Sequence, residues 1–174
     1  MKKSRTASDT LANIKDRLRH TGITWAIFAG AAASCYGSKR EITDIDILVR
    51  CEDLETAKTV LTDANALGFD IGAGAKIKTN EGTCLFFLDD RMIEKLNWRT
   101  LLGIKVPVLS VEDNIVFKAI LQRGKESGKH DVEDIKVMIA HEKIDLKYLR
   151  ERIRNCHAGR RVNSLLRSMI PEMP

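Results

Sequence analysis

The segment from residue 29 to residue 49 constrains the fold more than any other part of this 174-residue chain. A short apolar run ends at Gly30, small helix-favouring residues follow, and the segment closes with isoleucine and valine alternating with Asp44 and Asp46. A period of two is typical of a strand, so the two carboxylates are expected on one face, about 7 Å apart along the chain. The pattern predicts a strand, a tight turn, a short helix and a second strand.

The turn at Gly30 predicts a phosphate-binding site. A residue that lacks Cβ lets the backbone approach a phosphate closely, and the amides that open a helix favour negative charge. Ala31 adds a backbone amide and Ser34 a hydroxyl to this predicted nucleotide-binding set. Arg40 and Thr43 precede the acidic strand, and the guanidinium fork of Arg40 suits a phosphate. A surface salt bridge is the alternative for Arg40.

Asp44 and Asp46 are predicted to bind metal and to take part in catalysis. Mg²⁺ is commonly held by one or two carboxylates together with substrate phosphates, and two such ions can clamp the oxygens of a phosphoryl displacement. The sequence therefore predicts Mg²⁺, with two ions possible, beside a substrate that carries phosphate groups. The alternative for the two aspartates is a solvated strand end or a pair of turn caps.

Hydrophobic periodicity and turn residues predict the rest of the chain. The fold class is α/β (α+β), with a mixed sheet flanked by helices in residues 1–109 and a helical region packing on it in residues 110–174. Pro107 argues for an edge position of its strand. The predicted helices are 8–19, 52–67, 91–102, 111–123, 131–140 and one from residue 145, and the further strands are 69–79, 83–88 and 104–109.

Composition excludes several classes of protein. No apolar run approaches the roughly 20 residues that a membrane-spanning helix needs, so a cytoplasmic protein without membrane contact is expected. The four cysteines have no metal-ligand spacing and are expected to be reduced thiols. A net charge of +5 would attract polyanions, and the arginine-rich residues 150–161 are compatible with binding of RNA or DNA or with a solvated helix face.

The segment resembles the DNA polymerase beta type nucleotidyltransferase superfamily, especially its minimal and AbiEii-like toxin–antitoxin members. In that superfamily a glycine followed by glycine or serine opens a helix, and a strand with Asp-x-Asp follows. This chain has Ala31 after Gly30. Further matches lie at Tyr36, Gly37, Arg40 and Thr43, in residues 106–118 and in Lys-x-Asp-x-x-Asp-Ile at residues 129–135, so the resemblance spans about residues 23–140.

The resemblance implies a nucleoside triphosphate as substrate and Mg-dependent transfer of its nucleoside monophosphate to a hydroxyl on a small molecule, a protein or RNA. It also implies a third carboxylate on a later strand, where this chain has Phe86, so Asp89 at the end of that strand is the candidate third catalytic residue. Lys118 corresponds to a lysine near the nucleotide, with a solvated helix face as the alternative. A catalytically degenerate nucleotide-binding or toxin–antitoxin module is the competing interpretation.

The acidic residues near position 131 have a simpler interpretation from the sequence alone. Asp131, Glu133 and Asp134 follow Lys129 at the start of a predicted helix. Carboxylates in a first helical turn offset the helix dipole, so these residues are expected to be helix-start charges.

Overall fold

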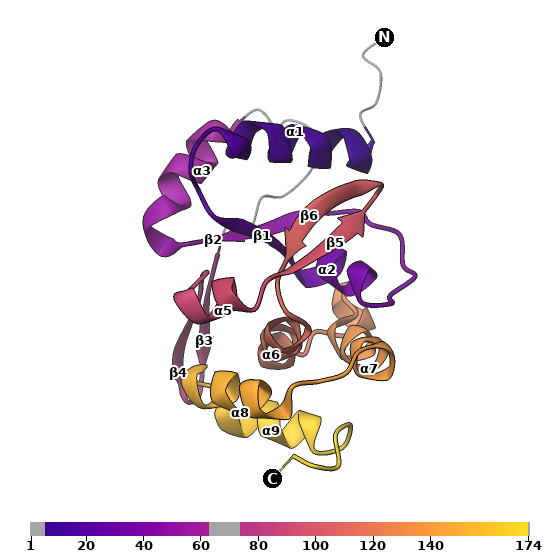
Figure 1. Cartoon of the computed structure of the whole chain (residues 1–174). Helices are drawn as coiled ribbons and strands as arrows, with labels where there is room; N and C mark the ends of the chain where they lie inside the picture. The colour runs from indigo at the N-terminus through magenta and orange to yellow at the C-terminus, as the bar shows by residue number, and fades with distance from the viewer. Residues whose placement is uncertain (1–5, 63–73, 174) are drawn as a thin grey trace.

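The computed structural model describes residues 6–62 and 74–173. In Figure 1 a sheet lies between α1 and α3 above it and the helices of the C-terminal half below it. Helix α1 spans Ala7–Arg19 and buries Leu11, Ile14 and Leu18, which recur at spacings of three and four along one face. The amphipathic helix predicted at the N-terminus is confirmed.

The main sheet has four strands in the order β2-β1-β6-β5. Their bounds are Trp25–Phe28 for β1, Asp46–Val49 for β2, Asn97–Leu101 for β5 and Ile104–Val108 for β6. Strand β1 pairs antiparallel with β2 and parallel with β6, and β5 pairs antiparallel with β6. The predicted mixed sheet is confirmed. All four residues of β1 are buried, which is expected of a central strand covered on both faces.

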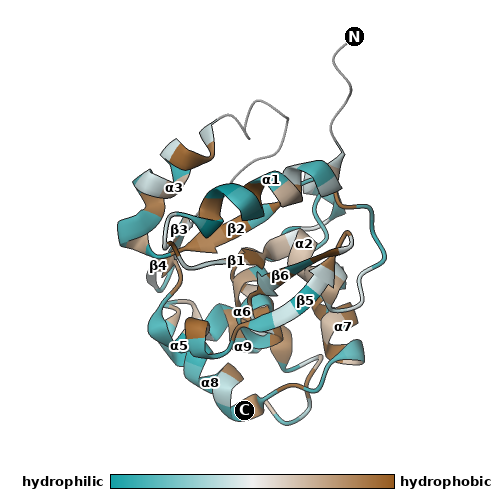
Figure 2. Cartoon of the chain, turned by 45° about the horizontal axis from the view of Figure 1, so that its top comes forward, coloured by the Kyte–Doolittle hydropathy of each residue, from teal (hydrophilic) through white to brown (hydrophobic). Residues whose placement is uncertain are grey.

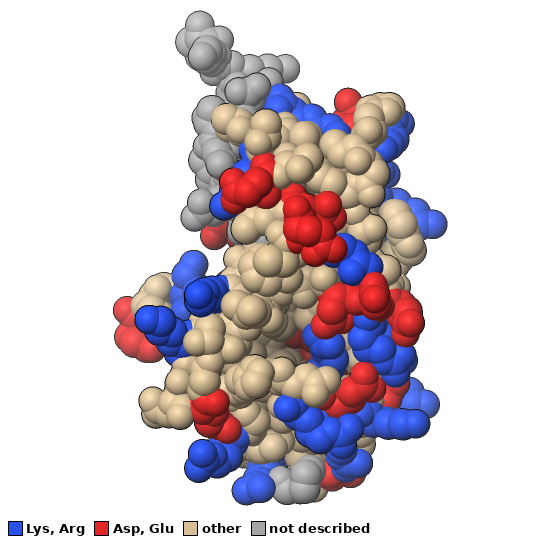
Figure 3. Space-filling view, turned by 90° about the vertical axis from the view of Figure 1, so that its left-hand side faces the viewer, with Lys and Arg blue, Asp and Glu red and all other residues tan. Residues whose placement is uncertain are grey.

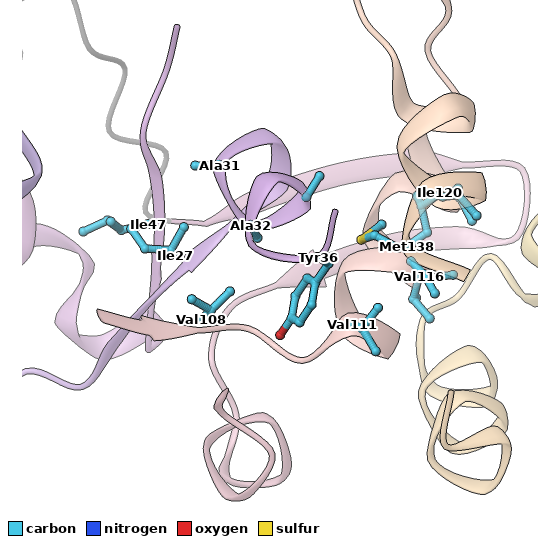
Figure 4. Close-up of a cluster of buried hydrophobic side chains, with 14 of the residues drawn as sticks. Ile27, Ala31, Ala32, Tyr36, Ile47, Val108, Val111, Val116, Ile120 and Met138 are labelled. Carbon is cyan, nitrogen blue, oxygen red and sulfur yellow. The ribbon is translucent and has the colours of Figure 1, made fainter. Parts of the chain in front are cut away.

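Helix α2, Ala29–Cys35, packs its small residues into the largest apolar cluster. Figure 4 shows Ala31, Ala32 and Tyr36 beside Ile27 and the neighbouring strand residues. The hydroxyl of Tyr36 donates a hydrogen bond to the carbonyl oxygen of Leu109 at 2.7 Å, which satisfies it inside the core. Figure 2 shows hydrophobic colour over β2 and much hydrophilic colour on the outer side of α1.

A β-hairpin forms a separate two-stranded sheet beside the main one. Its strands are β3, Ala75–Thr79, and β4, Gly82–Phe86. The backbone N–H of Leu88 donates to the carbonyl of Val49 at 2.9 Å, which ties the end of the hairpin to β2. The described part of this half also contains the short helices η1 at Cys51–Asp53, α3 at Leu54–Val60 and α5 at Asp90–Glu94.

The predicted C-terminal helical region is confirmed. It consists of α6 at Val111–Leu121, η2 at Lys125–Ser127, α7 at Asp131–His141, α8 at Leu146–Asn155 and α9 at Gly159–Leu166. Helix α6 is buried along almost its whole length, because the other helices and the sheet surround it (Figure 1). Ser110 and Asp145 cap α6 and α8 as their sequences indicate. None of the helices in the described ranges is both long and apolar enough to cross a bilayer.

Two predictions of local structure were wrong. Only the start of the helix predicted over residues 91–102 is helical, because residues 97–101 alternate between the two faces of β5. Pro107 does not lie on an edge strand, since β6 is flanked by β1 and β5. Strand β6 joins β1 at Val108 and through the N–H of Leu109, so the missing N–H of Pro107 is not needed.

Two predicted elements include residues that the structure does not describe. The described parts of the predicted helix 52–67 and strand 69–79 are α3 and β3, and residues 63–73 lie outside the described ranges. The division of the chain at residue 109 stays a prediction.

Candidate functional site

A cavity of about 130 Å³ lies at the start of α2 and brings together eight of the nine residues predicted for the site. The eight are Gly30, Ala31, Ser34, Arg40, Thr43, Asp44, Asp46 and Lys118. Residues that the sequence interpretation had not assigned to the site also line it, among them Glu41, Arg123, Lys129, His130 and Asp131. These residues come from four separate segments, so only the folded chain brings them together.

The turn from β1 into α2 has its left-handed residue at Ala29, where φ is +59°. Gly30 does not adopt a positive φ; a Cβ at Gly30 would meet nothing within 4 Å. The space beside Gly30 is therefore open toward the cavity, as a backbone site for phosphate requires. The left-handed backbone conformation of this turn is therefore at Ala29, one residue before Gly30.

Asn114 of α6 holds this turn in place. Its Oδ1 accepts a hydrogen bond from the backbone N–H of Ala29 at 3.0 Å. Its Nδ2 donates to the carbonyl oxygens of Leu109 at 2.9 Å and Ser110 at 3.0 Å. One buried amide thus links the β1–α2 turn to the β6–α6 turn.

Asp46 is the first residue of β2 and lies opposite Phe28 of β1. Asp44 lies two residues earlier, before the strand begins, and is exposed, whereas Asp46 is half-buried. Asp44 makes no hydrogen bond or ion pair with the described part of the chain. Both carboxylates line the same cavity, which is the arrangement that the Asp-x-Asp pattern predicted.

Three phenylalanine rings pack on the face of the sheet next to Asp46. The ring centroid of Phe86 lies 4.8 Å from that of Phe117 and 6.3 Å from that of Phe28. Phe86 is 5% exposed. The residue that the resemblance placed at the third-carboxylate position is thus part of an apolar cluster with Phe28 and Phe117.

Asp89 does not line the cavity, and its carboxylate has other partners. Oδ1 accepts the backbone N–H of Met92 at 2.8 Å and caps α5, while Oδ2 pairs with Arg152 of α8 at 2.8 Å. Within the described ranges, no three histidine, cysteine, aspartate or glutamate side chains converge to hold a metal ion.

Lys118 belongs to a buried ion-pair network at the floor of the cavity. Its Nζ lies 3.1 Å from Asp131 Oδ1 and 2.9 Å from Asp134 Oδ2, and its side chain is 4% exposed. Arg123 pairs with Asp131 at 2.8 Å, and Arg40 pairs with Asp134. The solvated-face alternative for Lys118 was therefore wrong. Asp131 and Asp134 do lie in the first turn of α7, as predicted, and they are also buried partners of Lys118.

The network explains the acidity of Asp131. Burial raises the pKa of Asp131. Hydrogen bonds and positive charge from Arg123 and Lys118 lower this pKa by more than burial raises it, so it lies below the ordinary aspartate value. Asp131 therefore remains ionised. Arg40, Lys118 and Arg123 are thus all paired with aspartates. Lys129, by contrast, is exposed and makes no ion pair with the residues that the structure describes.

Two sequence comparisons found nothing: no protein-family model matches this chain, and neither does any curated protein. Solved structures do match. The solution structure of the antibiotic-resistance factor ANT(2'')-Ia has a TM-score of 0.56 at 13% identity and covers 87% of this chain and 93% of its own. The crystal structure of ANT(2'')-Ia with adenylyl-2''-tobramycin has a TM-score of 0.55 at 13% identity and covers 86% of this chain and 98% of its own.

The lincomycin-bound lincosamide antibiotic adenylyltransferase LnuA is also similar. It has a TM-score of 0.51 at 18% identity, over 80% of this chain and 100% of its own. Identities this low establish the fold and not the activity. The chain has the nucleotidyltransferase fold.

Proposed function

We propose that the protein is a nucleotidyltransferase that moves a nucleoside monophosphate from a nucleoside triphosphate to a hydroxyl group of an acceptor, which is a small molecule, a protein or RNA. The observation that carries the proposal is the shared cavity, in which Asp44 and Asp46 face the open backbone at Gly30. The similarity in fold to nucleotidyltransferases with small antibiotic substrates supports a small-molecule acceptor.

The two carboxylates fit Mg²⁺. Asp44 is exposed and without a partner in the described chain, and Asp46 borders the same space. Two carboxylates together with triphosphate oxygens form an ordinary Mg²⁺ ligand set, and a second ion can share it. When bound, the metal would neutralise charge that develops on the transferring phosphate.

The residues of the chain position the triphosphate and the acceptor. Backbone amides at Gly30 and Ala31 and the hydroxyl of Ser34 are placed to receive phosphate oxygens, and Lys129 adds an unpaired positive charge. The acceptor oxygen forms a bond to the α-phosphorus, the bond from that phosphorus to the bridging oxygen breaks, and pyrophosphate leaves. The acceptor proton passes to solvent or to Glu41, which lines the cavity.

Replacement of Asp46 tests the proposal. We expect Asp46→Asn to abolish Mg-dependent binding of nucleoside triphosphate in calorimetric titrations and to abolish pyrophosphate release with a panel of hydroxyl acceptors. The matched control is Asp16→Asn, which removes an exposed carboxylate from α1. Full activity of Asp46→Asn with an intact fold would refute the mechanism.

Phe86 favours a second candidate function, a nucleotide-binding or toxin–antitoxin interaction module that has lost catalysis. The buried phenylalanine cluster stands where the resemblance implies a carboxylate. Titration of ATP, CTP, GTP and UTP with and without Mg²⁺ separates the two functions when it is combined with the pyrophosphate assay. Tight binding without any turnover on the acceptor panel would support the module.

A further inference from the structure

A second cavity, of about 540 Å³, opens between the β3–β4 hairpin and the ends of α6 and α9. Its size is in the range of small-molecule sites, and it is larger than the cavity at Asp46. The two cavities are neighbours along α6, since Lys118 lines the first while Ile120 and Leu121 line the second. A molecule in the second cavity would therefore contact the same helix that lines the proposed triphosphate site.

The second cavity is lined by both apolar and charged side chains. Ile77, Ile120 and Leu121 supply the apolar part of the lining. Among the described residues, the charged ones in the lining are three cations, Lys78, Arg160 and Arg161, and one carboxylate, Glu81. Figure 3 shows the left-hand side of the view in Figure 1, where blue Lys and Arg side chains, with red Asp and Glu among them, lie around a tan surface in the lower half.

The carboxylate of Glu81 already has partners within the protein. Glu81 accepts the backbone N–H groups of Arg160 at 2.9 Å and Arg161 at 3.2 Å, so it caps the start of α9. The hydrogen bond from the Arg160 backbone is the main reason that the pKa of Glu81 lies below its ordinary value. Glu81 thus stays charged and is not available to recognise a cationic ligand.

The three cations differ in how many hydrogen-bond or ion-pair partners they have within the protein. Arg161 donates its side-chain N–H groups to the carbonyl oxygens of Ile120 at 2.8 Å and Leu121 at 3.1 Å, which fixes it at the end of α6. The side chain of Arg160 is 90% exposed, and its Nε lies 3.6 Å from Glu81 Oε1, which is a long ion pair. Lys78 is exposed and has no ion pair within the described chain. Lys78 and Arg160 are therefore available to an external anion.

We propose that the second cavity is the acceptor site and that it takes a small organic anion, with an apolar body on the isoleucine lining and a phosphate or carboxylate group between Lys78 and Arg160. The assignment of this molecule as acceptor rests on the proposed nucleotidyl transfer. The anion site itself rests on the cavity, its charges and the commitment of Glu81. A polycationic acceptor does not fit such a lining.

Methyl NMR with labelled isoleucine tests the site directly, because Ile77 and Ile120 report on the second cavity and Ile42 on the first. The probes share one ring and differ in charge: phenyl phosphate, benzyl alcohol and benzylamine. We expect phenyl phosphate to shift the Ile77 and Ile120 signals saturably, and the other two probes to bind at least about tenfold more weakly. Equal binding of all three probes, or shifts confined to Ile42, would overturn the proposal.

Variants give the second arm of the test. The double substitution Lys78→Ala with Arg160→Ala is expected to weaken phenyl phosphate binding at least about tenfold. Lys76→Ala is the matched control, because Lys76 is exposed on the same strand but does not line the cavity. Equal affinities in the double variant and the control would also overturn the proposal.

The same spectra keep this proposal separate from the proposed function. Addition of Mg²⁺ with a nucleoside triphosphate is expected to move Ile42, and its failure would count against the nucleotide site alone. A phosphate probe that moves Ile77 and Ile120 would still establish the anion site in that case. Carboxylate and phosphate sources are distinguished by repeating the titration with benzoate.

Discussion

Lys118 Nζ lies 2.9 Å from Asp134 Oδ2, and the two side chains are only 4% and 2% exposed. This ion pair joins α6 to α7, and Arg40 joins the loop before Asp44 to the same aspartate. The loop that carries one proposed metal ligand is therefore anchored to the helical region through buried charge. Such a network depends on every partner, because an unmatched buried charge is costly.

Lys118→Met should destabilise the protein by about 3–5 kcal/mol, because it leaves two buried carboxylates with less compensation. Urea denaturation followed by circular dichroism measures the change. Lys125→Met is the control, since Lys125 and Glu133 form an exposed pair 3.8 Å apart, and it should change stability by less than about 1 kcal/mol. Similar losses in the two variants would contradict this account of the network.

The lowered pKa of Asp131 predicts a specific dependence of stability on pH. The folded-state pKa lies below the ordinary value of 3.8, so ionised Asp131 contributes stability that is present above that value and is lost as the pH falls through the folded-state pKa. The difference in free energy of unfolding between the native sequence and Asp131→Asn should therefore shrink on acidification. Urea titrations at a series of pH values measure it. A difference that grows toward acid would have the wrong sign.

Ala29→Gly should stabilise the fold by about 1 kcal/mol, because Ala29 is held at φ +59° and glycine adopts this conformation without a Cβ clash. Ala31→Gly, in the body of α2, should instead cost about 1 kcal/mol. Thermal unfolding of both variants measures the contrast. Equal destabilisation by the two glycines would rule out strain at Ala29.

Asn114→Ala should cost about 2–3 kcal/mol, because it removes the partner of the buried Ala29 N–H and of two carbonyl groups. It should also weaken binding of nucleoside triphosphate, since Gly30 follows directly on the released turn. Denaturation and calorimetry give the two readouts. Asn155→Ala, at the exposed end of α8, is the control and should affect neither.

Much of the local structure could be predicted from the sequence. The three-and-four spacing of Leu11, Ile14 and Leu18 determined α1, and the alternation after Asp44 determined β2. Ser110 and Asp145 marked the starts of two helices. These signals work because helix periodicity, strand alternation and capping involve residues within a few positions of one another.

What the sequence by itself determined about this protein is therefore its element types and a cavity with two aspartates near Gly30. Only the tertiary structure decided that Phe86 packs with Phe28 and Phe117, and that Asp89 forms an ion pair with Arg152. It also decided that the charges near position 131 are buried partners of Lys118. The physical reason is that burial and pairing depend on neighbours far along the chain, and local periodicity carries no record of them.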